Sequence, residues 1–141
     1  MKQFTVDVLT PSRAVARNIP AQALLIPTSR GQINVLPDHT HVVTQLSTGM
    51  LSIFGGADDP DRHFTVTHGI CKVLEDKIVI LSNTSEEQHE IDADRASRAL
   101  KFAQDKLASE SLNDEELVKY QRKVDRALLR LQLAQGLKAR K

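Results

Sequence analysis

The pattern of apolar and polar residues changes its period near Ser85. Before Ser85, apolar residues alternate with polar ones or form short β-branched runs, and turn signals such as Thr10-Pro11 and Thr48-Gly49 separate these runs. Strand character is found at residues 4–8, 23–26, 41–46, 50–54, 64–67 and 77–81. Many short strands at this spacing predict a β-sandwich or a flattened barrel.

After Ser85, apolar residues recur at every third or fourth position, which is the period of an α-helix. The first helical stripe comprises Ala96, Ala99, Leu100, Ala103 and Leu107, and the second comprises Leu117, Tyr120, Val124, Ala127, Leu128 and Leu131. Because the break at residues 109–114 is short, the two helices should lie antiparallel as a hairpin. The predicted fold is therefore β + α, with an N-terminal antiparallel β-sandwich (flattened barrel) at residues 1–86 and a C-terminal antiparallel two-helix hairpin at residues 87–141.

The ends of the two helices carry different signals. Asp92 can cap the first helix, but Arg95 stands where a capping box would have Glu or Gln. Asn113 and Glu116 form a complete capping box for the second helix, and Gly136 is a plausible stop. Arg95 is a cation near the positive end of a helix dipole, so it either faces solvent at small cost or has a partner.

The first helical stripe is rich in alanine, which lets the two helix axes approach closely but buries little area per turn. Buried apolar surface contributes about 25 cal/mol per Å2 to stability. Alanine contacts therefore leave the hairpin marginal by itself, and a marginal hairpin can dock, swing or extend.

Composition narrows the classes of function. A length of 141 residues predicts one domain, or a small domain with an appendage. A net charge of +1 does not indicate that the chain binds nucleic acid or a membrane surface. The absence of tryptophan argues against a base-stacking surface. The single Cys71 suits a reducing compartment.

The sequence contains no signal of membrane insertion. The start, MKQFTVDVL, alternates apolar and polar residues too early for a signal peptide. No apolar run approaches the roughly 20 residues that span a bilayer, so we expect membrane association only through partners.

Few residues suggest catalytic chemistry. His39 and His41 stand two apart in LPDHTHVV, with His63 and His68 further on, which raises the question of a metal site on a β-scaffold. The carboxylate that such a site needs is missing after His41, so two surface histidines on a loop are the simpler interpretation. Cys71 lies in an apolar strand context and is expected to be buried and inert. With no P-loop present either, we expect a non-catalytic protein without a metal.

The second helix has a face of one charge sign. Between Glu116 and the end of the chain only Asp125 is acidic, whereas five cations share one broad sector away from the centre of the apolar stripe. These cations are Lys119, Arg122, Lys123, Arg126 and Arg130. Two interpretations stay open: an ordinary solvated face, or a surface for an acidic partner or an anion.

Together these segments resemble the epsilon subunit of F-type ATP synthase over nearly the whole chain. The resemblance is carried by VDVLTP at residues 6–11, GQINVLPDHTHVV at 31–43, TGMLSI at 48–53, THGICKVLEDKIVILSN at 67–83 and IDADRA at 91–96. Where the family pattern has glycine, this chain has Asn34 and Asp38, two residue types that tolerate positive φ. His68 stands where the family often has a second glycine.

The resemblance implies a non-catalytic rotor-stalk subunit of the proton-translocating ATP synthase, at the cytoplasmic face of the bacterial inner membrane. The sandwich would bind the gamma subunit and rest on the c-ring. The hairpin would either fold against the sandwich or extend into the alpha/beta catalytic head, where it inhibits ATP hydrolysis. By position, the c-ring contact falls on Ser29, Arg30, Gly31, Pro37, Asp38, His39 and Thr40. Docking on the beta subunits would use Arg122, Lys123, Arg126 and Arg130.

The resemblance also implies a regulatory ATP site, which some bacterial members of the family hold between the folded helices. The family elements [IL]-D-x-x-R-A and R-x-x-x-R match residues 91–96 and 126–130. The candidate ligands are thus Glu86, Asp92, Arg95, Arg126 and Arg130, while Phe102 replaces a further family arginine. Apart from the resemblance, Arg126 and Arg130 lie one turn apart and can converge on phosphates, and Arg95 would join them if the helices fold together. The alternative is that the first element only caps and packs a helix.

Two other classes of function stay open at this stage. One is a free-standing binding module, in which the sandwich is a scaffold and the hairpin a partner helix. The other is a small β-fold metalloprotein. Co-purification with alpha, beta and gamma subunits distinguishes the first from a stalk subunit, and metal analysis addresses the second.

Overall fold

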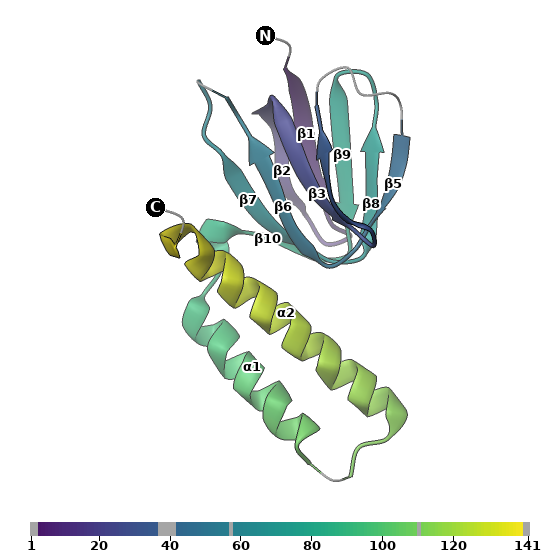
Figure 1. Cartoon of the computed structure of the whole chain (residues 1–141), viewed down its shortest axis with the longest axis vertical. Coiled ribbons are helices and arrows are strands. Elements are labelled where there is room, and N and C mark those ends of the chain that lie inside the picture. Colours follow the sequence, from purple (N-terminus) through teal and green to yellow (C-terminus); the bar gives the residue numbers. More distant parts are fainter. Residues whose placement is uncertain (1–2, 37–41, 57, 110, 140–141) are drawn as a thin grey trace. The chain divides into compact units, whose positions relative to one another are not determined.

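The computed structural model describes residues 3–36, 42–56, 58–109 and 111–139. It divides into two compact units, Met1–Gln88 and His89–Lys141 (Figure 1). The first unit is built of strands and the second of helices, which confirms the fold class expected from the sequence. The division lies two residues beyond the boundary placed at 86/87, because Glu87 still pairs with Phe64 in the sandwich.

Two five-stranded sheets make up the first unit. The first sheet has the order β2 (Ala14–Ala21), β1 (Phe4–Leu9), β9 (Lys77–Ser82), β8 (Gly69–Val73) and β5 (Val42–Leu46). The second has the order β10 (Ser85–Glu87), β7 (Arg62–Val66), β6 (Gly49–Phe54), β3 (Ala23–Thr28) and β4 (Gly31–Val35). The sheets lie face to face (Figure 1).

One strand pair departs from the antiparallel expectation. β1 and β9 run parallel, with Thr5 opposite Lys77 and Leu9 opposite Leu81. The other pairs among the described strands are antiparallel. Strands joined by a short turn must pair antiparallel, but β1 and β9 are separated by seven strands, and this long connection leaves their direction free.

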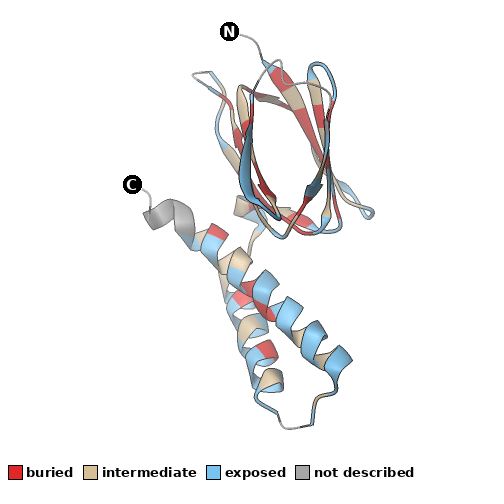
Figure 2. Cartoon of the chain, turned by 45° about the vertical axis from the view of Figure 1, so that its right-hand side comes forward, coloured by how far each residue is buried: buried red, intermediate tan, exposed pale blue. Residues whose placement is uncertain are grey.

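The core lies between the two sheets and is formed by alternate residues of each strand (Figure 2). Val6 and Val8 of β1 and Ile80 of β9 are fully buried, and so are Leu24 of β3 and Phe64 of β7. Residues between these positions lie on the other face of each strand, as a period of two requires, and Asp7 and Thr65 among them are also buried.

Four strands escaped the sequence prediction: β2, β4, β8 and β10. Three of them lie at sheet edges, where burial is incomplete and the alternation of apolar and polar residues is weak. In β4 the first four residues are exposed and only Val35 is buried. β2 contains Pro20, which an edge strand tolerates. β8 begins at Gly69; the strand context expected at Cys71 is confirmed, although no range was predicted for this strand.

Asn34, which stands where the family pattern has glycine, does not adopt positive φ. Asn34 lies in β4, and among the described residues other than glycine only Asn18 has positive φ, at 55°. The tight turn between β3 and β4 instead places the unusual conformation on Gly31, whose φ is 107°. Asp38, the second such position, lies outside the described residues.

The second unit is an antiparallel pair formed by α1 (Ala93–Leu107) and α2 (Asp114–Ala139), preceded by the short 3-10 helix η1 (Gln88–Glu90). Both predicted N-caps are confirmed. The Arg95 amide donates to Asp92 Oδ1 at 3.1 Å, and the Glu116 amide donates to Asn113 Oδ1 at 2.9 Å.

Two details of the hairpin prediction are wrong. α2 continues through Gly136 to Ala139, so Gly136 is not the stop. The apolar stripe of α2 is buried only along its middle, at Val124 and Ala127, while Leu117 and Leu128 stay 42% and 41% exposed. Leu117 and Leu128 lie at the edge of a stripe about 100° wide, and one narrow partner helix does not cover that width. For the same reason Ala99 of α1 is exposed.

The sandwich should fold without the hairpin, because its core is complete within one unit. A fragment of residues 1–88 should keep a cooperative unfolding transition with β-type circular dichroism, within a few degrees of the midpoint of the β signal in the full chain. Thermal and urea unfolding measure this. A non-cooperative transition would show that the helices belong to the same core.

Candidate functional site

The outer face of the first sheet carries an apolar surface, formed by Val43, Ile70 and Leu81. Their side chains are 63%, 36% and 40% exposed. Ile70 lies directly opposite Leu81 across β8 and β9. Val43 is the diagonal neighbour of Ile70, because β5 pairs Val43 with Lys72 and Gln45 with Ile70. Three neighbouring strands therefore present large apolar side chains to the outside, which marks an interaction site.

The sequence reasoning did not find the apolar surface, although a signal was present. Residues 78–81 of β9 form an unbroken apolar run instead of an alternating one. A strand that is apolar on both sides is expected to be covered on both sides. The core accounts for Ile78 and Ile80, so Val79 and Leu81 indicated a second, outer contact.

The turn between β3 and β4 holds the described part of the predicted c-ring contact. Ser29, Arg30 and Gly31 are all exposed. Thr28 stiffens this turn, because its Oγ1 donates to the Gly31 carbonyl at 2.7 Å and accepts from the Arg30 amide at 3.2 Å. Pro37, Asp38, His39 and Thr40 lie outside the described residues. The structure thus presents Arg30 on an exposed turn that two hydrogen bonds of Thr28 hold together.

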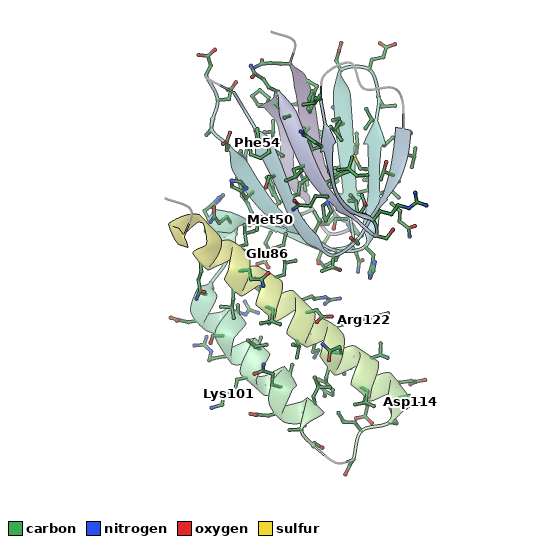
Figure 3. The ribbon with its side chains drawn as sticks, in the orientation of Figure 1. Met50, Phe54, Glu86, Lys101, Asp114 and Arg122 are labelled. Carbon is green, nitrogen blue, oxygen red and sulfur yellow. The ribbon has the colours of Figure 1, made fainter. Side chains whose placement is uncertain are left out.

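The cations of α2 form the basic face, defined as Arg122, Lys123, Arg126 and Arg130. They lie within a sector of about 100° around the helix. Arg122, Lys123 and Arg126 are exposed and Arg130 is half-buried. Figure 3 shows Arg122 on α2, and Lys101 on α1.

The hairpin register brings Arg95 level with two of these cations. The Phe102 and Tyr120 rings meet edge to face, with centroids 6.4 Å apart, and so align α1 with α2 at that point. Arg95 lies seven residues before Phe102, and Ala127 lies seven residues after Tyr120. Because both helices rise by about 1.5 Å per residue, Arg95 comes to the height of Arg126 and Arg130.

Phe102 occupies the position of a family arginine and makes different contacts. It is 54% exposed, and the Lys106 ammonium lies 5.6 Å from its ring centroid. Lys119 and Lys123 each lie 5.4 Å from the Tyr120 ring centroid. The aromatic pair thus links the two helices and is surrounded by positive charge.

The remaining two candidate ATP ligands differ in position. Asp92 caps α1 and uses Oδ1 for the Arg95 amide. Glu86 belongs to β10 in the sandwich unit, where its amide donates to Thr65 Oγ1 at 3.0 Å. Asp92, Arg95, Arg126 and Arg130 therefore belong to one compact unit and Glu86 to the other.

Cys71 is fully buried, and burial raises its pKa to about 12. A thiol with that pKa is protonated at neutral pH and is a poor nucleophile. His63 is also buried and shares a hydrogen bond with Ser52 Oγ at 2.8 Å. Among the described residues, no group of three or more His, Cys, Asp and Glu is placed to hold a metal ion. His39 and His41 lie outside those residues.

Within the described part of the chain, no helix combines the length and the apolar character that a membrane span requires.

An apolar outer sheet face and a basic helical face, on separate compact units, define a class of protein: a binding subunit that presents docking surfaces. Residues 3–88 match the family described as ATP synthase, Delta/Epsilon chain, beta-sandwich domain, and residues 89–135 match its long alpha-helix domain. The chain therefore belongs to the family of ATP synthase delta and epsilon chains. It is a non-catalytic rotor-stalk subunit of ATP synthase, and the alternatives of a free-standing module and a metalloprotein are not favoured.

Relatives resemble the chain along almost its whole length. The ATP synthase epsilon chain of Persephonella marina is 34% identical over 97% of this chain and 99% of that protein. The epsilon chain of Ruminiclostridium cellulolyticum is 34% identical over 93% of this chain and 95% of that protein. Matches at this coverage include both the sandwich and the hairpin.

Solved structures share the fold at lower identity. A chain of the Euglena gracilis mitochondrial ATP synthase, solved as OSCP/F1/c-ring, aligns with a TM-score of 0.70 at 21% identity, over 99% of this chain and 81% of that chain. A chain of the Tetrahymena thermophila central stalk and c-ring aligns with a TM-score of 0.59 at 17% identity, over the full length of both. These matches confirm the sandwich and hairpin architecture.

Proposed function

We propose that this chain couples the gamma subunit to the c-ring through its sandwich and inhibits ATP hydrolysis through its hairpin, at the cytoplasmic face of a bacterial inner membrane. The observation that carries the proposal is that the chain has both an exposed apolar surface, on the sandwich, and a basic face, on the hairpin. The first is suited to permanent assembly and the second to a reversible, charge-dependent contact.

The gamma subunit is the proposed partner of the apolar surface. Val43, Ile70 and Leu81 are exposed side by side on the outer face of the first sheet, although each loses stabilisation by facing water. A permanent partner removes that cost. The exposed cation Lys72 lies on the same face, next to Val43, and can fix the orientation of the partner through its charge.

The c-ring is the proposed partner of the β3–β4 turn. Ser29, Arg30 and Gly31 are exposed there, and the hydrogen bonds of Thr28 hold the turn in one conformation. A stiff turn transmits force with little loss, which a coupling element needs. We include Pro37, Asp38, His39 and Thr40 in this contact by position in the sequence alone.

The acidic surface of the beta subunits is the proposed partner of the basic face. Arg122, Lys123 and Arg126 are exposed on one sector of α2 and have few acidic neighbours along the helix. Asp125, the single acid in that stretch, accepts a hydrogen bond from Gln121 at 3.0 Å. An exposed surface of one charge sign suits an acidic dock.

ATP is the proposed regulatory ligand of the folded hairpin. Arg95 lies at the height of Arg126 and Arg130, so three guanidinium groups can contact a triphosphate. Charge-assisted hydrogen bonds contribute about 1.5–3 kcal/mol each. Part of this is offset by ordering a hairpin whose packing relies on Ala96, Ala103 and other small residues, so the affinity falls between about micromolar and millimolar. ATP then favours the folded hairpin and releases inhibition.

Titration of the isolated full-length chain with ATP tests the regulatory site. Amide NMR shifts in α1 and α2 should saturate at or below about millimolar ATP, since the ligand joins both helices. The variant Arg126→Ala with Arg130→Ala should not respond, whereas Arg98→Ala with Lys101→Ala, which removes two exposed cations of α1, should respond like wild type. Absence of any wild-type response at several times that concentration would mean that Arg95 merely accompanies a helix cap.

Reconstitution tests the function as a whole. The purified chain should form a complex with gamma that survives gel filtration, and it should lower the ATPase rate of the alpha/beta/gamma head. A chain that binds neither gamma nor the head would contradict the proposal.

A further inference from the structure

The sandwich ends in a very short strand that leads directly to the hairpin. β10 contains three residues, Ser85–Glu87, and lies at the edge of its sheet with β7 as its neighbour. Five residues, Gln88–Asp92, then connect Glu87 to the start of α1 at Ala93. A three-residue edge strand makes few backbone hydrogen bonds and is weakly held by itself. β10 is therefore the strand of the sandwich from which the chain continues into the second unit.

An ion pair holds the last residue of β10. Arg62 of β7 donates from Nε to Glu87 Oε2 at 2.7 Å and from Nη2 to Glu87 Oε1 at 2.6 Å. The Glu87 side chain is only 11% exposed, so solvent and salt screen the pair weakly. The Arg62 guanidinium also lies 5.6 Å from the centroid of the Phe64 ring, the residue opposite Glu87. The two parallel hydrogen bonds fix both the position and the orientation of Glu87.

Side chains also hold the two preceding residues. Arg13 Nη2 donates to the Ser85 carbonyl at 3.3 Å, and the Glu86 amide donates to Thr65 Oγ1 at 3.0 Å. Each residue of β10 is thus fixed by a side chain from elsewhere in the sandwich. The ion pair is the strongest of these contacts and the one next to the connector.

We propose that the Arg62–Glu87 ion pair is the anchor of the hairpin, because it fixes the end of the strand from which the chain continues into the helical unit. Without the pair, β10 detaches and the segment that joins the two units grows from five residues to eight, Ser85–Asp92. A longer connector defines the hairpin position less well and lowers its effective concentration at a dock. The link to inhibition rests on the proposed function; the anchor itself does not.

Hydrogen exchange in the isolated full-length chain tests the anchor. In Arg62→Gln, the amides of Ser85–Glu87 should exchange at least about tenfold faster, while the amides of β6 stay protected. Lys77→Gln is the matched control, since it removes another ion pair of the sandwich, Lys77 Nζ to Asp7 Oδ2 at 3.1 Å, and should leave β10 protection unchanged. Exchanging the two residues, Arg62→Glu with Glu87→Arg, should restore protection. Should Arg62→Gln fail to fold, Glu87→Gln removes the carboxylate of the pair and serves in its place, since the Arg62 side chain is 31% exposed and retains contact with solvent.

Inhibition of the reconstituted ATPase head completes the test. Arg62→Gln should inhibit several-fold less than Lys77→Gln at equal concentration of bound chain. Unchanged exchange in β10 overturns the anchor. Faster exchange with unchanged inhibition overturns the link between the anchor and inhibition. If the wild-type chain does not inhibit ATP hydrolysis, the proposed function is overturned. The hydrogen-exchange result still tests the anchor in that case.

Discussion

Replacing Ile70 with aspartate should abolish stable binding to the gamma subunit. Ile70 occupies the centre of the apolar surface, between Val43 and Leu81. A carboxylate buried there without a partner costs several kcal/mol, which corresponds to an affinity at least about a hundredfold weaker. The sandwich should stay folded, because the side chain is 36% exposed and points away from the core. Calorimetric titration with gamma and a thermal unfolding curve measure the two effects.

Leu74 offers a matched control for this prediction. Its side chain is 38% exposed, close to the value for Ile70, but it lies in the turn between β8 and β9 and outside the apolar surface. Leu74→Asp should therefore bind gamma like wild type. Full-strength binding by Ile70→Asp, or an equal loss in both variants, would remove the apolar surface from the gamma contact.

Neutralising the basic face should raise ATP hydrolysis by the assembled complex. Exposed ion pairs contribute about 0.2–1 kcal/mol each. Replacing Arg122, Lys123, Arg126 and Arg130 with alanine therefore removes about 1–4 kcal/mol of docking energy, or at least about a fivefold change in the ratio of docked to undocked hairpin. Steady-state ATPase rates measure the release. The difference from wild type should shrink as salt shortens the screening length.

Double variants separate the contribution of charge to docking from the loss of the proposed ATP ligands and from a general loss of positive charge. Arg122→Ala with Lys123→Ala spares Arg126 and Arg130, so it tests docking without altering the proposed ATP ligands. Arg98→Ala with Lys101→Ala removes the same charge from exposed positions of α1 and should leave inhibition unchanged. Inhibition that is equally strong at high salt, or that falls in both variants alike, would contradict an electrostatic dock.

The elements that the sequence predicts most easily are those whose environment requires a regular spacing of apolar residues. β1 alternates because one of its faces is in the core, and the caps Asp92 and Asn113 were found because capping depends on neighbouring residues alone. β4 and β10 were missed because an edge strand is stabilised by its neighbour, which lies elsewhere in the sequence. The parallel pairing of β1 with β9 is likewise a long-range property that no local pattern contains.

The candidate surfaces also differ in whether local sequence or long-range structure determines them. The basic face could be predicted, since charges at helical spacing identify a sector whatever packs beside it. The apolar surface could not, because the run at residues 78–81 does not say which side chains face the core until the register with β8 is known. The alignment of Arg95 with Arg126 likewise depended on the contact between Phe102 and Tyr120.

The parallel pair of β1 and β9 sets the order in which the sandwich can be built. β1 occupies an interior position in its sheet, yet its partner Lys77 lies 72 residues away from Thr5 in the chain. During synthesis, β1 must wait until almost the entire unit has been made before its second edge is covered. Pairing over so long a separation is slow, in the range of milliseconds to seconds for β-rich domains. When the complete chain refolds, the hairpin, whose contacts are local, should instead form in about microseconds, before the sandwich has closed.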